Sequence, residues 1–297
     1  MNAQAVIVGV DGSPRSDAAV VWAADEAATR NAHMLIVHAL DTNGMGLWST
    51  SRAMREDLRQ VTEPLVDRGI ALVHDRQPAV VVRGRVLVGS PTRILTLLSH
   101  NAQLVVVGRD GCGAFEWPWL GNLPERLLAH ATCPAVAAGA LVSAAPRHHV
   151  DRVVVGCAND EIDAATLQWG FEYAAAHDVP LLAVHAVHQP AGFVLPAATA
   201  SGYDVAVIEA ERDLDKAIDE WSEQYPSVDV TRLARTGPAR EVVVAACGTH
   251  DLLVLGHHHH TALAPRQLGV HATGVLRAAT CSVVVVHPSR IRAEHAE

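Results

Sequence analysis

The chain has 297 residues, about twice the length of a typical domain, and its apolar fraction of 49% is enough for a substantial core. Its formal net charge of −9 argues against a nucleic-acid-binding protein, which normally presents a basic face, and against attachment to an anionic membrane surface. The five cysteines lack CxxC spacing. The start of the chain lacks the features of a secretion signal. No apolar run approaches the ~20 residues of a membrane span. These features predict a soluble cytoplasmic protein in a reducing compartment, with no nucleic-acid or membrane partner.

The first half of the chain alternates short apolar runs, typical of buried strands, with amphipathic segments, typical of helices. Ser13 as N-cap and Pro14 at the first helical position mark the start of the first helix. In chain order, the expected strands are Ala5–Val10, Met34–Leu40, Val80–Val88, Leu104–Gly108 and Pro134–Ala138. The expected helices between them are Ser13–Asn31, Ser51–Asp67, Ser90–Asn101 and Asn122–Ala131. This order predicts an α/β, Rossmann-like domain: a doubly wound, five-stranded parallel sheet that binds ligands at the carboxyl ends of its strands near the switch point.

The second half of the chain repeats the first. An offset of 147 residues aligns Trp22 with Trp169, His38 with His185, and Pro91 with Pro238. An offset of 148 aligns residues 102–111 with 250–259, and 131–138 with 279–286, so one residue is inserted between the two sets of blocks. We therefore expect two tandem domains of this fold, at residues 1–145 and 150–297, joined by a short linker.

The loop after the fourth strand reads "GRDGCGAFEWPWLGN", with glycines at Gly108, Gly111, Gly113 and Gly121. Closely spaced glycines at a strand end let the backbone approach a ligand and let amide N–H groups surround phosphate oxygens. A helix that begins after Gly121 adds unsatisfied N–H donors. A flexible surface loop with Asn122 as a helix N-cap explains the spacing equally well.

A resemblance favours the phosphate interpretation. The spacing Gly-x2-Gly-x9-Gly followed by a small polar residue is similar to the nucleotide signature of the universal stress protein family, with Gly108, Gly111, Gly121 and Asn122 at those positions. The segments "VGVDGS", "VHAL" and "ATCPAV" also resemble that family, and the matches cover essentially the whole chain twice. The chain therefore resembles a tandem universal stress protein of the actinobacterial type.

The resemblance implies a pocket for an adenine nucleotide (ATP, AMP or ADP) in the first half, with Mg²⁺ left open. The residues that it assigns to this pocket are Gly9, Asp11, Ala39, Gly108, Arg109, Gly111, Gly121, Asn122 and Leu123. Asp11 would accept hydrogen bonds from the nucleoside, Ala39 would offer backbone groups to the adenine, and the glycines would surround the ribose and phosphates. Asn122 stands where the family usually has Ser or Thr, but an Asn amide still donates, so we expect altered phosphate contact and not an abolished site. Two alternatives stay open: Asp11 as a turn former, and Arg109 as an ordinary exposed arginine.

The second half departs from this pattern. Its counterparts of Asp11, Gly111 and Asn122 are Ala158, His259 and Val270. A side chain at position 259 adds bulk where the motif needs close approach. The glycines that remain in the second half are Gly156, Gly256 and Gly269. We expect this half to keep the fold and to bind nucleotide weakly or not at all.

Four consecutive histidines, His257, His258, His259 and His260, raise the alternative of a metal site. Zinc accepts imidazole ligands in tetrahedral geometry, but consecutive residues of an extended loop point alternately to opposite sides. No Cys or carboxylate stands at a recognised spacing from them. We therefore expect a solvated loop, with a metal site as the weaker alternative.

The preferred functional hypothesis is an ATP-binding or adenine-nucleotide-binding regulatory factor of the stress response that acts on an unidentified protein partner. The loop offers only Asp110 and Glu116 as candidate catalytic groups, so we assign no catalytic residue and leave slow ATP hydrolysis open. The resemblance implies pairing through the last strands and a homodimer. The alternatives are a scaffold protein of the same fold that binds no nucleotide, and an adenylate- or flavin-using enzyme. Against ATP-pyrophosphatase chemistry, "VGVDGS" has Val10 where a second glycine is needed.

Overall fold

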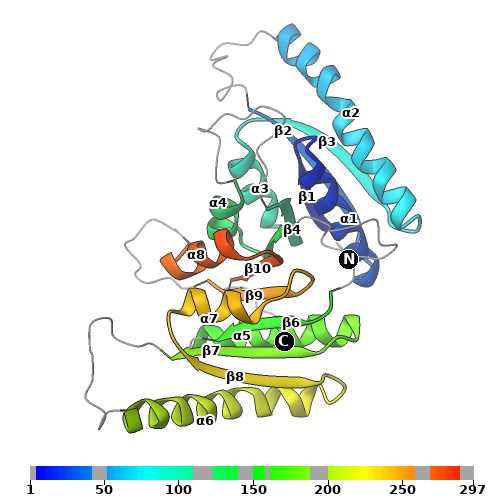
Figure 1. Cartoon of the computed structure of the whole chain (residues 1–297). Helices are drawn as coiled ribbons and strands as arrows, with labels where there is room; N and C mark the ends of the chain where they lie inside the picture. The colour runs from blue at the N-terminus through cyan, green and yellow to red at the C-terminus, as the bar shows by residue number, and fades with distance from the viewer. Residues whose placement is uncertain are drawn as a thin grey trace. The chain divides into compact units, whose positions relative to one another are not determined.

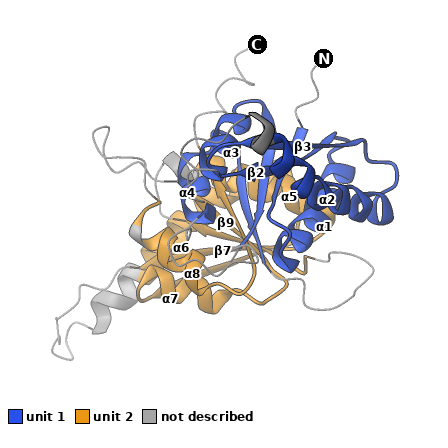
Figure 2. Cartoon of the chain, turned by 90° about the horizontal axis from the view of Figure 1, so that it is seen from above, with its two compact units in different colours: residues 1–148 blue, residues 149–297 orange. Residues whose placement is uncertain are grey.

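The computed structural model of the chain, drawn in Figure 1, describes residues 5–41, 52–109, 123–139, 150–157, 161–187, 200–257 and 268–287. The chain divides into two compact units, Met1–His148 (unit 1) and His149–Glu297 (unit 2), which Figure 2 colours separately. Among the helices in the described ranges, none is long and apolar enough to cross a membrane.

Unit 1 contains five parallel strands in the order β3-β2-β1-β4-β5. The strands are β1 (Ala5–Val10), β2 (Met34–Leu40), β3 (Val82–Val88), β4 (Ala102–Gly108) and β5 (Ala135–Ala138). The helices are α1 (Pro14–Thr29), α2 (Arg52–Arg76), α3 (Pro91–Ser99) and α4 (Leu123–His130). The predicted doubly wound α/β fold is confirmed.

The central strands β1 and β4 are apolar on both faces because helices cover both. The chain moves from β1 outward to β3 and then returns to β4, so right-handed crossovers place α1 and α2 on one face and α3 and α4 on the other. Accordingly, α1 packs against α2, and α3 packs against α4. Val6, Val8, Leu104 and Val106 are completely buried between these layers. This burial explains why both strands read as continuous apolar runs.

Helix α2 ends well beyond the predicted end at Asp67. Val73, in the additional part, is completely buried. The last residue, Arg76, is fastened to α1, since its Nε and Nη2 donate to the two carboxylate oxygens of Asp25 at 2.8 and 2.7 Å. The hydrogen bond to this carboxylate raises the pKa of Arg76. Contacts with α1 therefore stabilise the end of α2, so the sequence of α2 alone does not show where the helix ends.

Unit 2 repeats the arrangement, with its parallel strands in the order β10-β9-β6-β7-β8. The strands are β6 (Val153–Cys157), β7 (Leu181–Val187), β8 (Val230–Thr236), β9 (Leu252–Gly256) and β10 (Ser282–Val286). The helices are α5 (Glu161–His177), α6 (Ala200–Gln224), α7 (Ala239–Ala246) and α8 (Val270–Ala278).

The one-residue difference between the two units falls earlier than the sequence alignment placed it. Strand β7 begins 147 residues after β2, whereas α6, β8 and α7 each begin 148 residues after α2, β3 and α3. The additional residue of unit 2 therefore lies between β7 and α6, before the third strand of the unit.

This shift changes which residues are equivalent at the start of α3 and α7. Gly89 and Gly237 both have positive φ, 141° and 143°, and each N–H donates to the carbonyl of the last residue of β2 or β7, at 3.0 and 3.1 Å. The alignment of Pro91 with Pro238 is therefore wrong by one residue. A glycine with positive φ, which other residues adopt only at a cost, is the shared feature.

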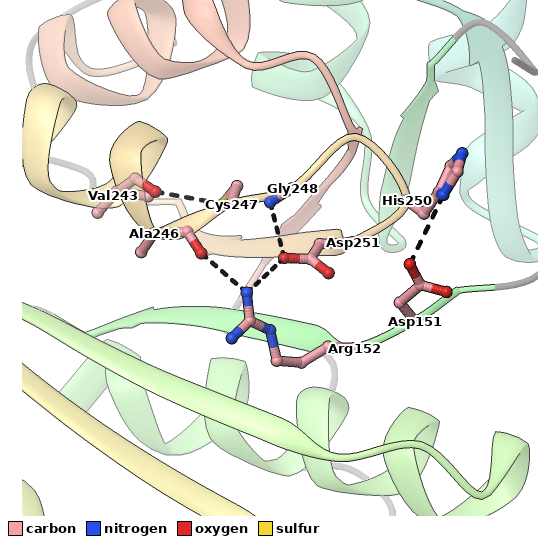
Figure 3. A network of polar contacts seen from close by, with 8 residues as sticks. All are labelled: Asp151, Arg152, Val243, Ala246, Cys247, Gly248, His250 and Asp251. Carbon is pink, nitrogen blue, oxygen red and sulfur yellow. Dashed lines mark hydrogen bonds and ion pairs between the residues drawn. The ribbon is translucent and has the colours of Figure 1, made fainter.

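A polar network joins the loop after α7 to the start of β6 in unit 2 (Figure 3). Arg152 Nη2 donates to the carbonyl of Ala246 at 3.0 Å and to Asp251 Oδ2 at 2.8 Å. The same carboxylate oxygen accepts the N–H of Gly248 at 2.8 Å. Because Asp251 is only 6% exposed, these donors offset the cost of burying its charge.

We expect the substitution Asp251→Ala to lower the free energy of unfolding of unit 2 by ~2 kcal/mol, because it leaves the Gly248 N–H without its acceptor and Arg152 without its counter-charge. Hydrogen exchange of unit 2 peptides in increasing urea measures this loss. Asp151→Ala is the control: its carboxylate is 56% exposed and lies 3.6 Å from His250 Nδ1, so its removal costs little. Equal effects of the two substitutions would contradict the role of the network.

The Cys247 thiol in the same loop is a poor nucleophile. Its Sγ donates to the carbonyl of Val243 at 3.2 Å. A hydrogen bond with the Cys281 thiol, followed by burial, raises the pKa of Cys247 far above its ordinary value of 9.0. Since the thiolate is the reactive form, Cys247 stays protonated and unreactive in the folded protein.

The raised pKa of Cys247 predicts slow alkylation of its thiol. At pH 8.5, we expect iodoacetamide to alkylate it at least about tenfold more slowly in the folded protein than in urea, as peptide mass spectrometry can show. The raised pKa also links stability to pH: its contribution is complete below pH 9.0 and falls as pH rises above that, because only the unfolded chain then ionises this thiol. Equal alkylation rates in the folded protein and in urea would refute the thiol pair of Cys247 and Cys281.

Candidate functional site

The carboxyl ends of β1, β2 and β4 border a recess in unit 1, at the point where the strand order reverses beside β1. This switch-point recess has about 500 Å³ of empty space, part of it open to solvent. Its lining residues are Gly9, Val10, Asp11, Ser13, Ser16, Val37, His38, Ala39, Pro91, Leu95, Val107, Gly108 and Leu123. Five predicted site residues are thus brought together: Gly9, Asp11, Ala39, Gly108 and Leu123.

Asp11 is a polar residue in the lining of the recess. Its Oδ1 accepts the N–H of Ser13 at 2.9 Å, so it does form a turn. Ser13 in turn caps α1, since its Oγ accepts the N–H of Ser16 at 3.2 Å. Among the described residues, Asp11 Oδ2 has no hydrogen-bond partner. The turn holds the carboxylate in place and leaves one oxygen for a ligand, so the two interpretations of Asp11 are compatible.

His38 also lines the recess, although the sequence motifs assign it no role there. Its Nδ1 lies 2.9 Å from the carbonyl of Val10, and in unit 2 His185 Nδ1 lies 3.0 Å from the carbonyl of Cys157. Because a carbonyl only accepts, Nδ1 carries the proton in both rings. The repeated imidazole therefore ties the end of the first strand of each unit to the second strand. In the sequence, the signal for this role is a histidine near the end of the second apolar strand of both halves.

Gly108 is required by packing as well as by any ligand. A Cβ at this position would lie 2.8 Å from the carbonyl oxygen of Arg15, in the first turn of α1. At Gly9, a Cβ would lie 2.9 Å from Leu95 Cδ1 and 3.2 Å from Val107 Cγ1, both on the wall of the recess. The glycine at position 108 thus lets α1 approach β4, whereas Gly9 keeps the floor of the recess open.

The rest of the predicted phosphate loop is only partly described. The Arg109 N–H donates to the carbonyl of Ala138 at 2.9 Å, which extends the pairing of β4 with β5. Leu123 begins α4. Gly111, Gly121 and Asn122 lie outside the described residues.

In unit 2, Gly156 lies in β6 and Gly256 ends β9, as Gly9 lies in β1 and Gly108 ends β4 in unit 1, and Gly269 is the N-cap of α8. The positions of Ala158 and His259 lie outside the described residues. Val270 is the first residue of α8.

His257 differs from the expected solvated tract. It is only 2% exposed, and its ring stacks on that of His287 with the centroids 4.7 Å apart. His258, His259 and His260 lie outside the described residues. Across the described ranges, no group of three or more His, Cys, Asp or Glu side chains is placed to hold a metal ion. The expectation of a solvated loop is therefore wrong for His257, which is part of the packed interior.

Comparisons with known proteins match the same repeated domain. The model of the universal stress protein family matches residues 2–138 and, again, residues 149–287. Universal stress protein Rv2005c of Mycobacterium tuberculosis is 30% identical over 295 residues, which cover 96% of this chain and 97% of that protein. The crystal structure of a universal stress protein from Archaeoglobus fulgidus has a TM-score of 0.70 at 14% identity, covering 96% of this chain and 97% of its own. A universal stress protein solved in complex with cAMP covers 46% of this chain and 99% of its own, at 23% identity and a TM-score of 0.38.

We expect Gly108→Ala to destabilise the ligand-free protein by about 1–3 kcal/mol, because the added methyl group meets the Arg15 backbone and not a flexible side chain. Urea denaturation with no nucleotide added measures this. Gly248→Ala is the matched control, since its Cβ would have its nearest contact at an ordinary 3.6 Å. If Gly108→Ala were as stable as the wild type, the glycine would serve a ligand alone.

Proposed function

Since the chain belongs to the universal stress protein family, we propose that unit 1 binds an adenine nucleotide and that the protein acts as a regulatory factor of the stress response. The observation that carries this proposal is the switch-point recess, with the Asp11 carboxylate fixed in its lining. Open α/β sheets bind their ligands at this place.

The lining of the recess suits a nucleoside. Most of its lining side chains are apolar, among them Val10, Leu95 and Leu123, and apolar side chains suit contact with an adenine ring. Its polar side chains are fewer, as in most small-molecule pockets. In the proposed complex, Asp11 Oδ2 accepts a hydrogen bond from the ribose, and the backbone of Ala39 contacts the base.

The proposed phosphate end lies between Gly108 and Leu123. The end of β4 and the start of α4 both border the recess. The N-terminus of a helix favours an anion because its first N–H groups have no partners within the helix. Arg109, Gly111, Gly121 and Asn122 complete the proposed set. Whether ATP, ADP or AMP binds there, and whether Mg²⁺ accompanies it, stays open in this proposal.

Unit 2 is proposed to bind nucleotide weakly or not at all. The changes to Ala158, His259 and Val270 remove a carboxylate, a glycine and a polar side chain from the motif. Gly156, Gly256 and Gly269 keep the backbone frame. On this proposal, domain 1 (residues 1–145) is the nucleotide-binding domain, and domain 2 (150–297) has kept the fold without the ligand.

Regulation by occupancy follows from this division. A bound nucleotide would change the surface of unit 1 beside the recess, and this change would alter contact with a protein partner. A cytoplasmic location and a homodimer formed through the last strands belong to the same proposal. Slow ATP hydrolysis is a side reaction that it permits without a dedicated catalytic residue.

A scaffold protein that binds no nucleotide is the second candidate. One observation favours it: Asp11 already has a structural partner in the Ser13 N–H, so the turn alone is a sufficient reason for this residue.

The nucleotide content of the purified protein distinguishes the two candidates. Small molecules are released from freshly purified protein by denaturation and identified by chromatography and mass spectrometry. We expect about one adenine nucleotide per chain, since the proposal places a binding pocket in unit 1 alone. About two nucleotides per chain would contradict the proposal that unit 2 binds nucleotide weakly or not at all. No bound nucleotide, together with no thermal shift on adding ATP, would establish the scaffold.

Substitution of Asp11 locates the site. Asp11→Ala should weaken nucleotide binding by about tenfold or more, because a charged acceptor is lost. Asp11→Asn keeps an acceptor for the Ser13 N–H, so it should leave thermal stability unchanged and weaken binding less. Asp17→Asn is the control, because that carboxylate is paired with Arg68 away from the recess. Calorimetric titration with ATP measures all three, and equal affinities in the three variants would exclude this recess.

A further inference from the structure

A second cavity in unit 1 lies at the opposite end of its strands from the switch-point recess. It has about 920 Å³ of empty space, part of it open to solvent. Ala5, in its lining, is the first residue of β1, and His33, also in its lining, directly precedes β2. The recess borders the carboxyl ends of the same strands. This amino-end cavity is therefore a feature that the proposed nucleotide site does not use.

Two arginines of β3, Arg83 and Arg85, form the basic part of the cavity lining. Gly84, between them, faces α2, because a Cβ there would overlap Val66 of that helix. Side chains alternate along a strand, so both arginines point to the other face of the sheet. Their Cα atoms are about 6.6–7 Å apart, the span of two residues of a strand. Two flexible arginine side chains at this spacing can both contact one anion.

The face of β3 that carries the two arginines is open to solvent. Helix α3 lies on this face, but it packs mainly against β4, β1 and β2. Arg83 is paired in register with Leu35 of β2, which is half-buried, and both arginines are exposed. Leu35 and Val81 give the cavity an apolar part beside its basic part. A ligand can therefore reach both parts from solvent.

The charge of Arg83 and Arg85 is not balanced locally. Neither side chain has a hydrogen-bond or ion-pair partner within the described part of the chain. The described lining of the cavity also contains no carboxylate. By contrast, Arg68, Arg76 and Arg152 are each paired with an aspartate. In a chain with a net charge of −9, two such arginines beside one cavity indicate an anionic ligand.

Unit 2 has no such pair at the corresponding positions. Strand β8 begins 148 residues after β3, so Arg83 and Arg85 correspond to Thr231 and Leu233. The shared fold therefore does not require basic residues there, and the pair is particular to unit 1.

Protection of the sheet edge is a simpler role for the two arginines. Strand β3 is the last in the strand order of unit 1, and charged side chains on an edge strand discourage pairing with other chains. This role explains their charge. It gives no reason for the cavity beside them or for its apolar part, so the two roles need an experiment that separates them.

We propose that the amino-end cavity binds a small organic phosphate, a phosphate monoester with an apolar body. Arg83 and Arg85 bind the phosphate group, because a guanidinium donates two parallel hydrogen bonds to phosphate oxygens. Two guanidinium charges also match the charge of a phosphate monoester, which is close to −2 at neutral pH. Leu35 and Val81 contact the apolar body, and His33 is a further polar group beside it.

Calorimetric titration of the full chain with phenyl phosphate tests the proposal. Arg83→Ala and Arg85→Ala should each weaken binding about tenfold, because each removes one charge-assisted contact. Arg93→Ala is the matched control, since Arg93 is an exposed arginine of α3 outside the described lining of the cavity. All three arginines are exposed, so each variant should unfold at nearly the same temperature as the wild type.

Two further ligands test the two parts of the cavity. Inorganic phosphate lacks the apolar body, and benzyl alcohol lacks the charge. Each should bind at least about tenfold more weakly than phenyl phosphate, because each uses only one part of the cavity. Inorganic phosphate that binds as tightly as phenyl phosphate would overturn the apolar part of the proposal.

The variants also distinguish a ligand site from edge protection. Unchanged affinity for phenyl phosphate in both Arg83→Ala and Arg85→Ala, or an equal loss in Arg93→Ala, would overturn the cavity as a site. Aggregation of the double variant with unchanged affinity would assign the two arginines to protection of the edge. Neither arginine lines the recess, so the adenine nucleotide content should stay that of the wild type, and failure of the nucleotide proposal leaves this test intact.

Discussion

The pairing of β1 with β2 on one side and with β4 on the other is the constraint on which the functional edge of unit 1 depends. It brings the carboxyl ends of three strands together, and it places α1 directly over the end of β4. Gly108 then has to be a glycine because the Arg15 carbonyl occupies the space of a side chain. The same pairing puts His38 within reach of the Val10 carbonyl. The turn at Asp11 and the floor at Gly9 follow from the position of β1 in the middle of the sheet.

Most of the fold could be predicted from the sequence because its signals are local. Apolar runs marked the strands, Ser13 and Pro14 marked the start of α1, and the repeat showed that the pattern occurs twice. The end of α2 could not be predicted, since it depends on Asp25 in another helix. The alignment of Pro91 with Pro238 failed because proline at the start of a helix is common, whereas the shared backbone requirement falls on Gly89 and Gly237.

The candidate site was predicted unevenly for a similar reason. Gly9, Asp11, Ala39, Gly108 and Leu123 meet at one recess, as the strand order required. The roles of these residues could not be predicted because they depend on contacts between distant segments. The close approach at Gly108 joins α1 to the end of β4, and the hydrogen bond of His38 to Val10 leaves no mark in the sequence except that the histidine is repeated. His257 illustrates the opposite error, because four histidines in a row looked solvated while the first is buried against His287. The two units thus share one backbone frame, and they differ in the polar groups that line its edges.

The parallel pairing of β1 with β4 has a consequence for how the protein folds. Val6 pairs with Leu104, so the central pair of each sheet forms only after roughly a hundred residues of intervening chain have been brought together. Until then β1 is an apolar strand with open edges. Its counterpart β6 has a similar apolar sequence, VVVGC against VIVGV, so pairing of either strand with the β4 or β9 of the wrong half is the folding error that we expect. Synthesis from the N-terminus limits this exchange, because unit 1 can close its sheet before the strands of unit 2 leave the ribosome.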